Sequence, residues 1–165
     1  MRSPDFFVIA SLLLASTANA GAQDKQAPTC GPFTVLAEID AREIVDLGAE
    51  GPSAGDLRIG RYILQGESGD QRGTMHFSAT LMPAATNGQY PVFVTSHYQF
   101  ANGALTTIAV VGLPDTAGTE HGPDGDLEYA ITGGTGVFAQ ASGTLSTKTA
   151  KDSRRKMRFD LTCRR

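Results

Sequence analysis

The chain has 165 residues, a net charge of −3 and two cysteines. A chain of this length provides one domain, and the small net charge argues neither for nor against a nucleic-acid partner. The basic run at residues 151–158 contains no aromatic side chain, so we expect no nucleic-acid binding. This run is either a patch for an anionic partner or simply a solvated hairpin.

The N-terminal segment has the features of an export signal. Arg2 is followed by the apolar run Phe6–Ala15 and then by Ala18-Asn19-Ala20, which has the form of a cleavage site. The apolar run is shorter than the roughly 20 residues that a membrane span needs. We therefore expect a signal peptide at residues 1–20, a polar leader at residues 21–32 and a single domain at residues 33–165. The exported protein is expected to be secreted or periplasmic, with no membrane span.

The rest of the chain has the pattern of short β-strands separated by glycine and proline turns. We find no internal repeat and no amphipathic helix. The sequence Ala101-Asn102-Gly103 is a strong hairpin turn, and the longest loop is expected at Pro114–Gly125. The predicted strands are Phe33–Ile44, Asp56–Gly66, Thr74–Met82, Pro91–Phe100, Ala104–Leu113, Asp126–Ile131, Val137–Thr147 and Lys156–Cys163.

These eight strands predict an all-β fold, an eight-stranded antiparallel β-barrel, in which closure removes the exposed sheet edges. The cysteines, Cys30 and Cys163, lie near the two ends of the exported chain. The first and last strands of a barrel are neighbours, so a disulfide between these cysteines would join the closing seam. The alternative is a pair of buried free thiols.

Alternation along each strand divides the side chains into an inner and an outer set. In the third strand, Met75 and Phe77 share one face, and His76 and Ser78 share the other. In the first strand, Val35, Ala37, Ile39 and Ala41 alternate with Leu36, Glu38, Asp40 and Arg42. A simple soluble barrel has its apolar faces inside, but the alternation alone leaves the choice of face open. If the polar faces point inward, then Val35, Ile39, Met75 and Phe77 point outward and need a partner surface.

A dense set of glycines occurs in Ala130–Gly143, which reads A-I-T-G-G-T-G-V-F-A-Q-A-S-G. Glycines packed this closely indicate positive φ angles or close approach of another strand. We expect a strand, a tight corner and a second strand here, with Gly133, Gly134 and Gly136 in a structural role. No lysine or helix follows, so these glycines do not form a phosphate-binding loop.

This segment closely resembles the signature of the allene oxide cyclase and dirigent families, which share a small β-barrel. The resemblance extends from about Val35 to Phe159. It includes Leu36-Ala37-Glu38-Ile39-Asp40, Gly55-Asp56-Leu57, Phe100–Gly103 and Tyr129–Gly134.

The resemblance implies a barrel that binds a hydrophobic, oxygenated small molecule and steers its cyclisation, as an isomerase without cofactor or metal. Glu38 matches the glutamate with which the cyclases stabilise positive charge on the ligand. Asp40 replaces their water-holding asparagine, and Tyr62 replaces a second polar amide residue. Two nearby carboxylates in a dry cavity would form a possible acid and base pair. If their face is the inner one, His76, Ser78 and Thr80 join them as candidate ligand-binding residues.

Other functions remain open. Glu38 and Asp40 are equally consistent with a solvated strand face. The barrel could be a non-catalytic, lipocalin-like carrier in the periplasm, or a dirigent-like protein that guides the stereochemistry of a coupling reaction. The carboxylates between His121 and Glu128 suggest a polar turn rather than a Ca²⁺ loop. The resemblance also implies association as a homotrimer.

Overall fold

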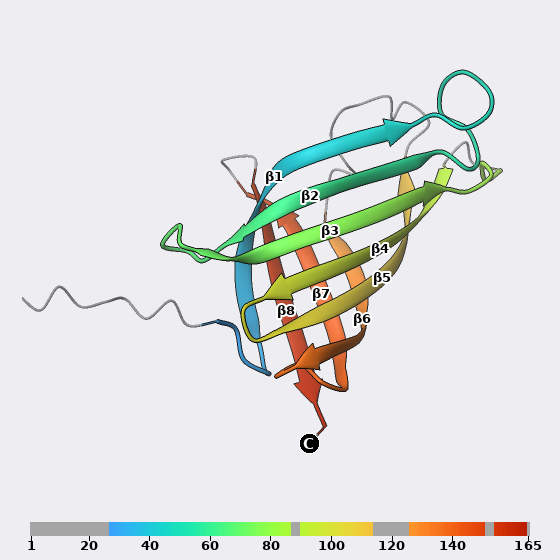
Figure 1. The fold of residues 1–165 in the computed structure, drawn as a ribbon. Helices are drawn as coiled ribbons and strands as arrows, with labels where there is room; N and C mark the ends of the chain where they lie inside the picture. The colour runs from blue at the N-terminus through green and yellow to red at the C-terminus, as the bar shows by residue number, and fades with distance from the viewer. Residues whose placement is uncertain (1–26, 87–89, 114–125, 151–153, 165) are drawn as a thin grey trace, which may run out of the picture.

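A computed structural model describes residues 27–86, 90–113, 126–150 and 154–164. These residues form one closed barrel of eight strands, shown in Figure 1. The strands are β1 (Phe33–Val45), β2 (Leu57–Gln65), β3 (Gln71–Leu81), β4 (Tyr90–Phe100), β5 (Gly103–Leu113), β6 (Leu127–Gly136), β7 (Ala141–Thr149) and β8 (Arg155–Cys163).

Each strand pairs antiparallel with the next along the chain, and β8 pairs with β1 to close the barrel. The predicted fold class is therefore confirmed. The hairpin between β4 and β5 turns on Ala101 and Asn102 alone, as the Asn-Gly sequence predicts. Among the described residues, no helix is long and apolar enough to cross a membrane. The predicted signal peptide, the first six leader residues and the predicted loop at 114–125 lie outside the described residues.

The apolar faces of the strands point into the barrel. The clearest case is β4, where Val92, Val94, Tyr98 and Phe100 are buried and the residues between them at 93, 95, 97 and 99 are exposed. Burial of these side chains is the main stabilising contribution to such a fold. The alternative that the sequence left open, with the polar strand faces inside the barrel, is wrong. Of the residues that it places outside, Val35 and Met75 are buried, and Phe77 packs against the core.

A β-bulge interrupts the alternation of β1. Ile39 lies opposite Tyr62 and Ala41 lies opposite Arg61, so Asp40 is the extra residue between two consecutive pairs. A bulge shifts the inward and outward phase of the strand by one residue. As a result Arg42, rather than Ala41, shares the inner face with Ala37. The strict alternation expected from the sequence is wrong beyond Asp40.

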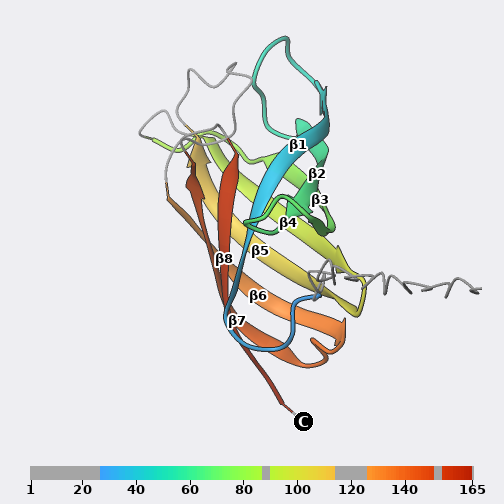
Figure 2. The same cartoon turned by 90° about the vertical axis from the view of Figure 1, so that its left-hand side faces the viewer.

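The end of the barrel where β1 begins and β8 ends is filled by aromatic rings. Phe33 stacks on Phe159 with ring centroids 4.5 Å apart, and Phe100 and Phe138 lie 5.6 and 6.0 Å from Phe33. Phe138 and Phe159 are fully buried. This aromatic plug closes the lower end of the barrel, where Figure 2 shows the end of β8.

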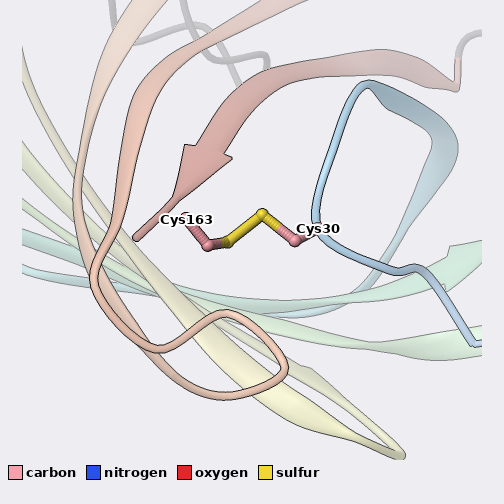
Figure 3. The surroundings of a disulfide bond; sticks show 2 residues. All are labelled: Cys30 and Cys163. Atoms are coloured by element: carbon pink, nitrogen blue, oxygen red, sulfur yellow. A yellow bond between two sulfur atoms is a disulfide. The ribbon is translucent and has the colours of Figure 1, made fainter. Parts of the chain in front are cut away.

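A disulfide joins Cys30 to Cys163 (Figure 3), and Cys163 packs against the buried core. The two Cα atoms lie 6.1 Å apart, and 133 positions separate the cysteines in the sequence. The bond ties the segment before β1 to the end of β8, as predicted for the closing seam. A hydrogen bond of 2.8 Å from Asn102 Nδ2 to the Pro28 carbonyl holds the same segment.

The glycine-rich segment differs in detail from the predicted strand, corner and strand. Strand β6 continues through Gly133 and Gly134 to Gly136, and the turn follows at residues 137–140. A Cβ on Gly134 would lie 2.6 Å from two backbone oxygens, those of Ala104 and Phe138. Gly136 has φ +62, in the left-handed region, as it enters the turn. The close approach of β5 and of the turn therefore requires glycine at both positions.

Candidate functional site

The candidate site is a cavity inside the barrel, at the end opposite the aromatic plug. In an antiparallel barrel, the ends of β1, β3, β5 and β7 and the beginnings of β2, β4, β6 and β8 lie at the same end. Most of the cavity-lining residues come from these parts of the strands. The cavity has a volume of about 90 Å³. A cavity that holds one water needs only about 10–15 Å³, so this cavity accommodates a small organic molecule.

Most of the wall is apolar. The apolar lining residues are Ile44, Met75, Phe77, Ala79, Val92, Val94, Val111, Leu127 and Met157. Room for the Phe77 ring is provided by Gly60 on the neighbouring strand, where a Cβ would lie 2.5 Å from that ring. A largely apolar wall with a few polar groups is typical of small-molecule sites in barrels.

Three tyrosines supply hydroxyl groups to this wall: Tyr62 on β2, Tyr98 on β4 and Tyr129 on β6. Tyr98 is fully buried, and burial raises the pKa of its phenol well above the usual value. Burial also raises the pKa of Tyr129, while the positive charge of Arg155 opposes that rise. Tyr98 and Tyr129 are therefore neutral hydrogen-bond donors near neutral pH.

Two further hydroxyls lie near Tyr98. Ser96 and Thr107 face each other across β4 and β5, with exposed fractions of 4% and 2%. Proximity to them opposes the rise in the pKa of Tyr98. Even so, neither Ser96 Oγ nor Thr107 Oγ1 has a partner with full hydrogen-bond geometry among the described residues. Buried hydroxyls of this kind usually bind water or a ligand atom.

The open end of the cavity carries three arginines: Arg42 on β1, Arg58 on β2 and Arg155 on β8. Arg42 is exposed, whereas Arg58 and Arg155 are partly buried. Arg155 Nη1 donates to Thr147 Oγ1 over 3.3 Å, and Thr147 is a buried residue of the cavity wall. The lining residues in the described part of the chain thus combine cations and neutral donors, and none of these described residues is acidic.

The loop between β1 and β2 borders this end and is organised by Asp56. The Asp56 carboxylate accepts hydrogen bonds from the backbone N–H groups of Leu47 (2.9 Å) and Ser53 (2.7 Å) and from the Ser53 hydroxyl (3.0 Å). These backbone hydrogen bonds lower the pKa of Asp56 despite its burial. The Asp56 carbonyl also accepts from the Leu81 N–H over 2.9 Å, which fixes the loop on β3.

Of the residues predicted from the sequence as catalytic, only Tyr62 lines the cavity. Glu38 is exposed on the outer face, where it accepts a hydrogen bond of 3.3 Å from Gln65. Asp40 is the bulge residue and forms an ion pair with Arg61, also outside. The structure therefore does not bring the two carboxylates into the cavity with Tyr62.

The predicted ligand-binding residues His76, Ser78 and Thr80 alternate with cavity residues along β3 and point to the outer face. His76 is exposed and lies directly opposite His97 of β4. No group of three or more potential metal ligands occurs among the described residues.

Sequence reasoning missed Tyr98, Tyr129 and the three arginines. Tyr98 and Tyr129 each alternate in phase with the apolar residues of their strands, and that signal would have identified them. Arg58 and Arg155 stand at strand starts, where the pattern is too short to assign a face. Arg42 is hidden by the bulge, for which the sequence gives no clear signal.

The comparisons with known proteins concern the fold. No protein-family model matches the chain, and no curated protein matches its sequence. A solved structure described as pyocyanin demethylase superposes with a TM-score of 0.66 and 21% identity, covering 79% of this chain and 99% of that one. AbnU, described as an exo-specific intermolecular Diels-Alderase, gives 0.62 at 12% identity, covering 79% and 96%. The Diels-Alderase AbmU from Streptomyces koyangensis gives 0.60 at 11% identity, covering 80% of this chain and 68% of that one. The chain therefore has the fold of these small barrel proteins.

Proposed function

We propose that this protein binds a hydrophobic, oxygenated small molecule in the barrel and steers its cyclisation or isomerisation. The observation that carries the proposal is the cavity itself, which is lined mostly by apolar residues and by three tyrosines from three strands. Such a site restricts a flexible guest to few conformations, and this restriction alone accelerates one ring closure over others.

The similar folds support this reading. A demethylase and two Diels-Alderases use barrels of this kind, and their names describe reactions on small organic molecules. Fold similarity alone does not transfer a reaction. It supports the proposal only in that barrels of this fold include proteins named for reactions on small molecules.

The donors in the cavity favour reactions in which negative charge develops on an oxygen atom of the guest. Opening an allene oxide is one such reaction: the epoxide C–O bond breaks, a C–C bond closes the ring, and the oxygen remains as a ketone. Tyr62 and Tyr129 would donate to that oxygen, with Arg155 adding positive charge nearby. This role differs from the one that the family resemblance implies for Glu38, because Glu38 lies on the outer face and no carboxylate of the described residues lines the cavity.

The test is chiral product analysis with the purified exported protein and freshly generated fatty-acid allene oxide. Spontaneous cyclisation gives a racemate, so an enantiomeric excess measures steering directly. We expect Tyr62→Phe or Tyr129→Phe to reduce the excess, while Glu38→Gln on the outer face leaves it unchanged. Loss of the excess in Glu38→Gln, with Tyr62→Phe unaffected, would contradict the cavity as the site.

A second candidate function is a non-catalytic carrier barrel. It is favoured by the lining at the described positions, which includes no carboxylate and no histidine, since these groups usually serve as general bases. A racemic product together with saturable ligand binding would support the carrier over the cyclase. The trimer and the secreted or periplasmic location remain predictions of the sequence, to be tested by sedimentation and by fractionation of the producing cells.

A further inference from the structure

The outer face of the barrel carries two histidines side by side. His76 on β3 lies directly opposite His97 on β4, and both side chains are exposed. Figure 1 shows the two strands as neighbours in the barrel wall. The chain has only three histidines, so most of its imidazole groups are gathered in this one pair.

The sheet fixes the separation of the two side chains. Strands β3 and β4 pair regularly, without a bulge. Met75 beside His76 and Tyr98 beside His97 are buried in the core, which anchors both strands at this point. Side chains at directly opposite positions have Cβ atoms about 4.5–5.5 Å apart. The two imidazoles therefore start from a short separation that the fold holds in place.

The ring nitrogens of this pair are not engaged by neighbouring side chains. Within the described part of the chain, neither imidazole takes part in a hydrogen bond, an ion pair or a ring contact. Arg61 on β2 lies opposite His76, but its guanidinium forms an ion pair with Asp40. Thr106 on β5 lies opposite His97, and its hydroxyl interacts with a threonine hydroxyl of β6 over 3.0 Å. The residues that flank the pair are thus occupied elsewhere, and the imidazole nitrogens face solvent.

We propose that His76 and His97 together bind a divalent transition-metal ion on the outer face of the barrel. Imidazole nitrogen is a good ligand for Zn²⁺, Ni²⁺ and Cu²⁺. Two nitrogens at about 2.0–2.1 Å from one ion lie about 3 Å apart, and imidazoles on directly opposite positions reach this separation by inclining toward each other.

Water completes the coordination of the ion. The described residues contain no group of three or more histidine, cysteine or carboxylate ligands. An ion held by two imidazoles therefore keeps open positions and exchanges with solution, unlike an ion in a closed structural site. The site lies outside the cavity, so the inference does not depend on the proposed function.

The experiment titrates the untagged exported protein with Ni²⁺ in a calorimeter, at mildly alkaline pH, where free imidazole is neutral. We expect one bound ion per chain. His76→Gln and His97→Gln should each weaken binding on the order of a hundredfold, because the second imidazole no longer binds the ion intramolecularly. Both positions are exposed, so the variants should fold as the wild type does.

The third histidine provides a matched control. His121 lies outside the described residues, and His121→Gln should bind Ni²⁺ with the affinity of the wild type. A second readout is thermal unfolding. Ni²⁺ should raise the midpoint of the wild type, because an ion held between two strands binds the folded barrel in preference to the unfolded chain. This rise should be lost in His76→Gln and in His97→Gln.

Three results would overturn the inference. The first is a wild-type protein that binds no Ni²⁺. The second is equal binding by the wild type, His76→Gln and His97→Gln, since the ion then binds elsewhere. The third is a loss in His121→Gln as large as in the other two variants, because the site is then not this pair alone. The proposed function stands in each case, since product analysis with the allene oxide tests the cavity and not this face.

Discussion

Removal of the disulfide by Cys30→Ser with Cys163→Ser should destabilise the barrel strongly without changing its fold. The bond closes a loop of 133 residues. On the chain-entropy model, a cross-link over this length stabilises the folded state by about 5 kcal/mol, and measured losses usually fall at about 2–5 kcal/mol. Domains of this size unfold with a free energy of only about 5–15 kcal/mol. The disulfide therefore supplies a large share of the net stability.

The structure gives a reason to expect a loss of stability within the range of about 2–5 kcal/mol. Strands β1 and β8 pair over only five positions, from Phe33 opposite Phe159 to Ala37 opposite Arg155. The disulfide lies just beyond this short seam. The buried rings keep the seam closed once the chain has folded, so the cross-link acts mainly on the unfolded chain.

The assay is urea unfolding followed by far-ultraviolet circular dichroism, with the oxidised wild type, the reduced wild type and the double variant. The double variant and the reduced wild type should unfold together, at a lower midpoint than the oxidised protein. Their slope with urea should be steeper, because an uncross-linked unfolded chain exposes more surface. A loss below about 1 kcal/mol, or a variant that lacks the native spectrum before urea is added, would refute the argument from chain entropy.

Three other predictions concern single residues. Asp56→Asn should lower the free energy of unfolding by about 1–3 kcal/mol, because the amide cannot accept all the hydrogen bonds of the loop. Folding lowers the pKa of Asp56, so the wild-type contribution of Asp56 to stability is present above the unfolded pKa and is lost as the pH falls through the folded pKa. Acid titration of the unfolding free energy of both proteins checks this contribution. Burial raises the folded pKa of Tyr98, so the contribution of Tyr98 to stability is full below the usual tyrosine pKa and declines above it by about 1.4 kcal/mol per pH unit. Tyr98→Phe should make the alkaline slope in urea unfolding curves shallower, and the part due to Tyr129, whose pKa burial also raises, should remain. Gly134→Ala should destabilise the protein by about 1–3 kcal/mol, because the new Cβ would clash with the backbone oxygens of Ala104 and Phe138. Thermal unfolding measures the loss, and Thr135→Ala, at an exposed position on the same strand, is the control that should shift the thermal midpoint little.

The strands and their order could be predicted from the sequence because two local signals agree. Alternation of apolar and polar side chains defines the strands, and the Asn-Gly turn after Phe100 places β4 and β5 to within a residue. The cysteines near the two ends were enough to predict the seam. The end of β6 was predicted wrongly, because Gly133 and Gly134 look like a corner. They belong to a strand that needs glycine for the close approach of the neighbouring chain.

The candidate site could be predicted much less well, because it depends on which face of each strand points inward. Tyr62 was found through the family resemblance, whereas Glu38 was carried over from it onto a strand face that the structure places outside. The charge distribution of the barrel explains the difference. Its carboxylates at positions 38 and 40 lie on the outer face, the latter paired with an arginine, while the cavity retains arginines and tyrosines.

The bulge at Asp40 is the feature that gives the cavity its chemistry. With regular alternation, Ala41 and Glu43 would face the barrel interior with Ala37, and the mouth would carry a carboxylate beside Arg58. The extra residue turns Arg42 and Ile44 inward instead, and both line the cavity. One inserted position thus replaces an acidic side chain with a guanidinium at the opening. Deletion of Asp40 removes only the extra residue, so the pairs of Ala41 with Arg61 and of Arg42 with Gly60 should persist. Arg42 and Ile44 should then stay on the inner face, and the deletion variant should keep the ligand binding of the wild type.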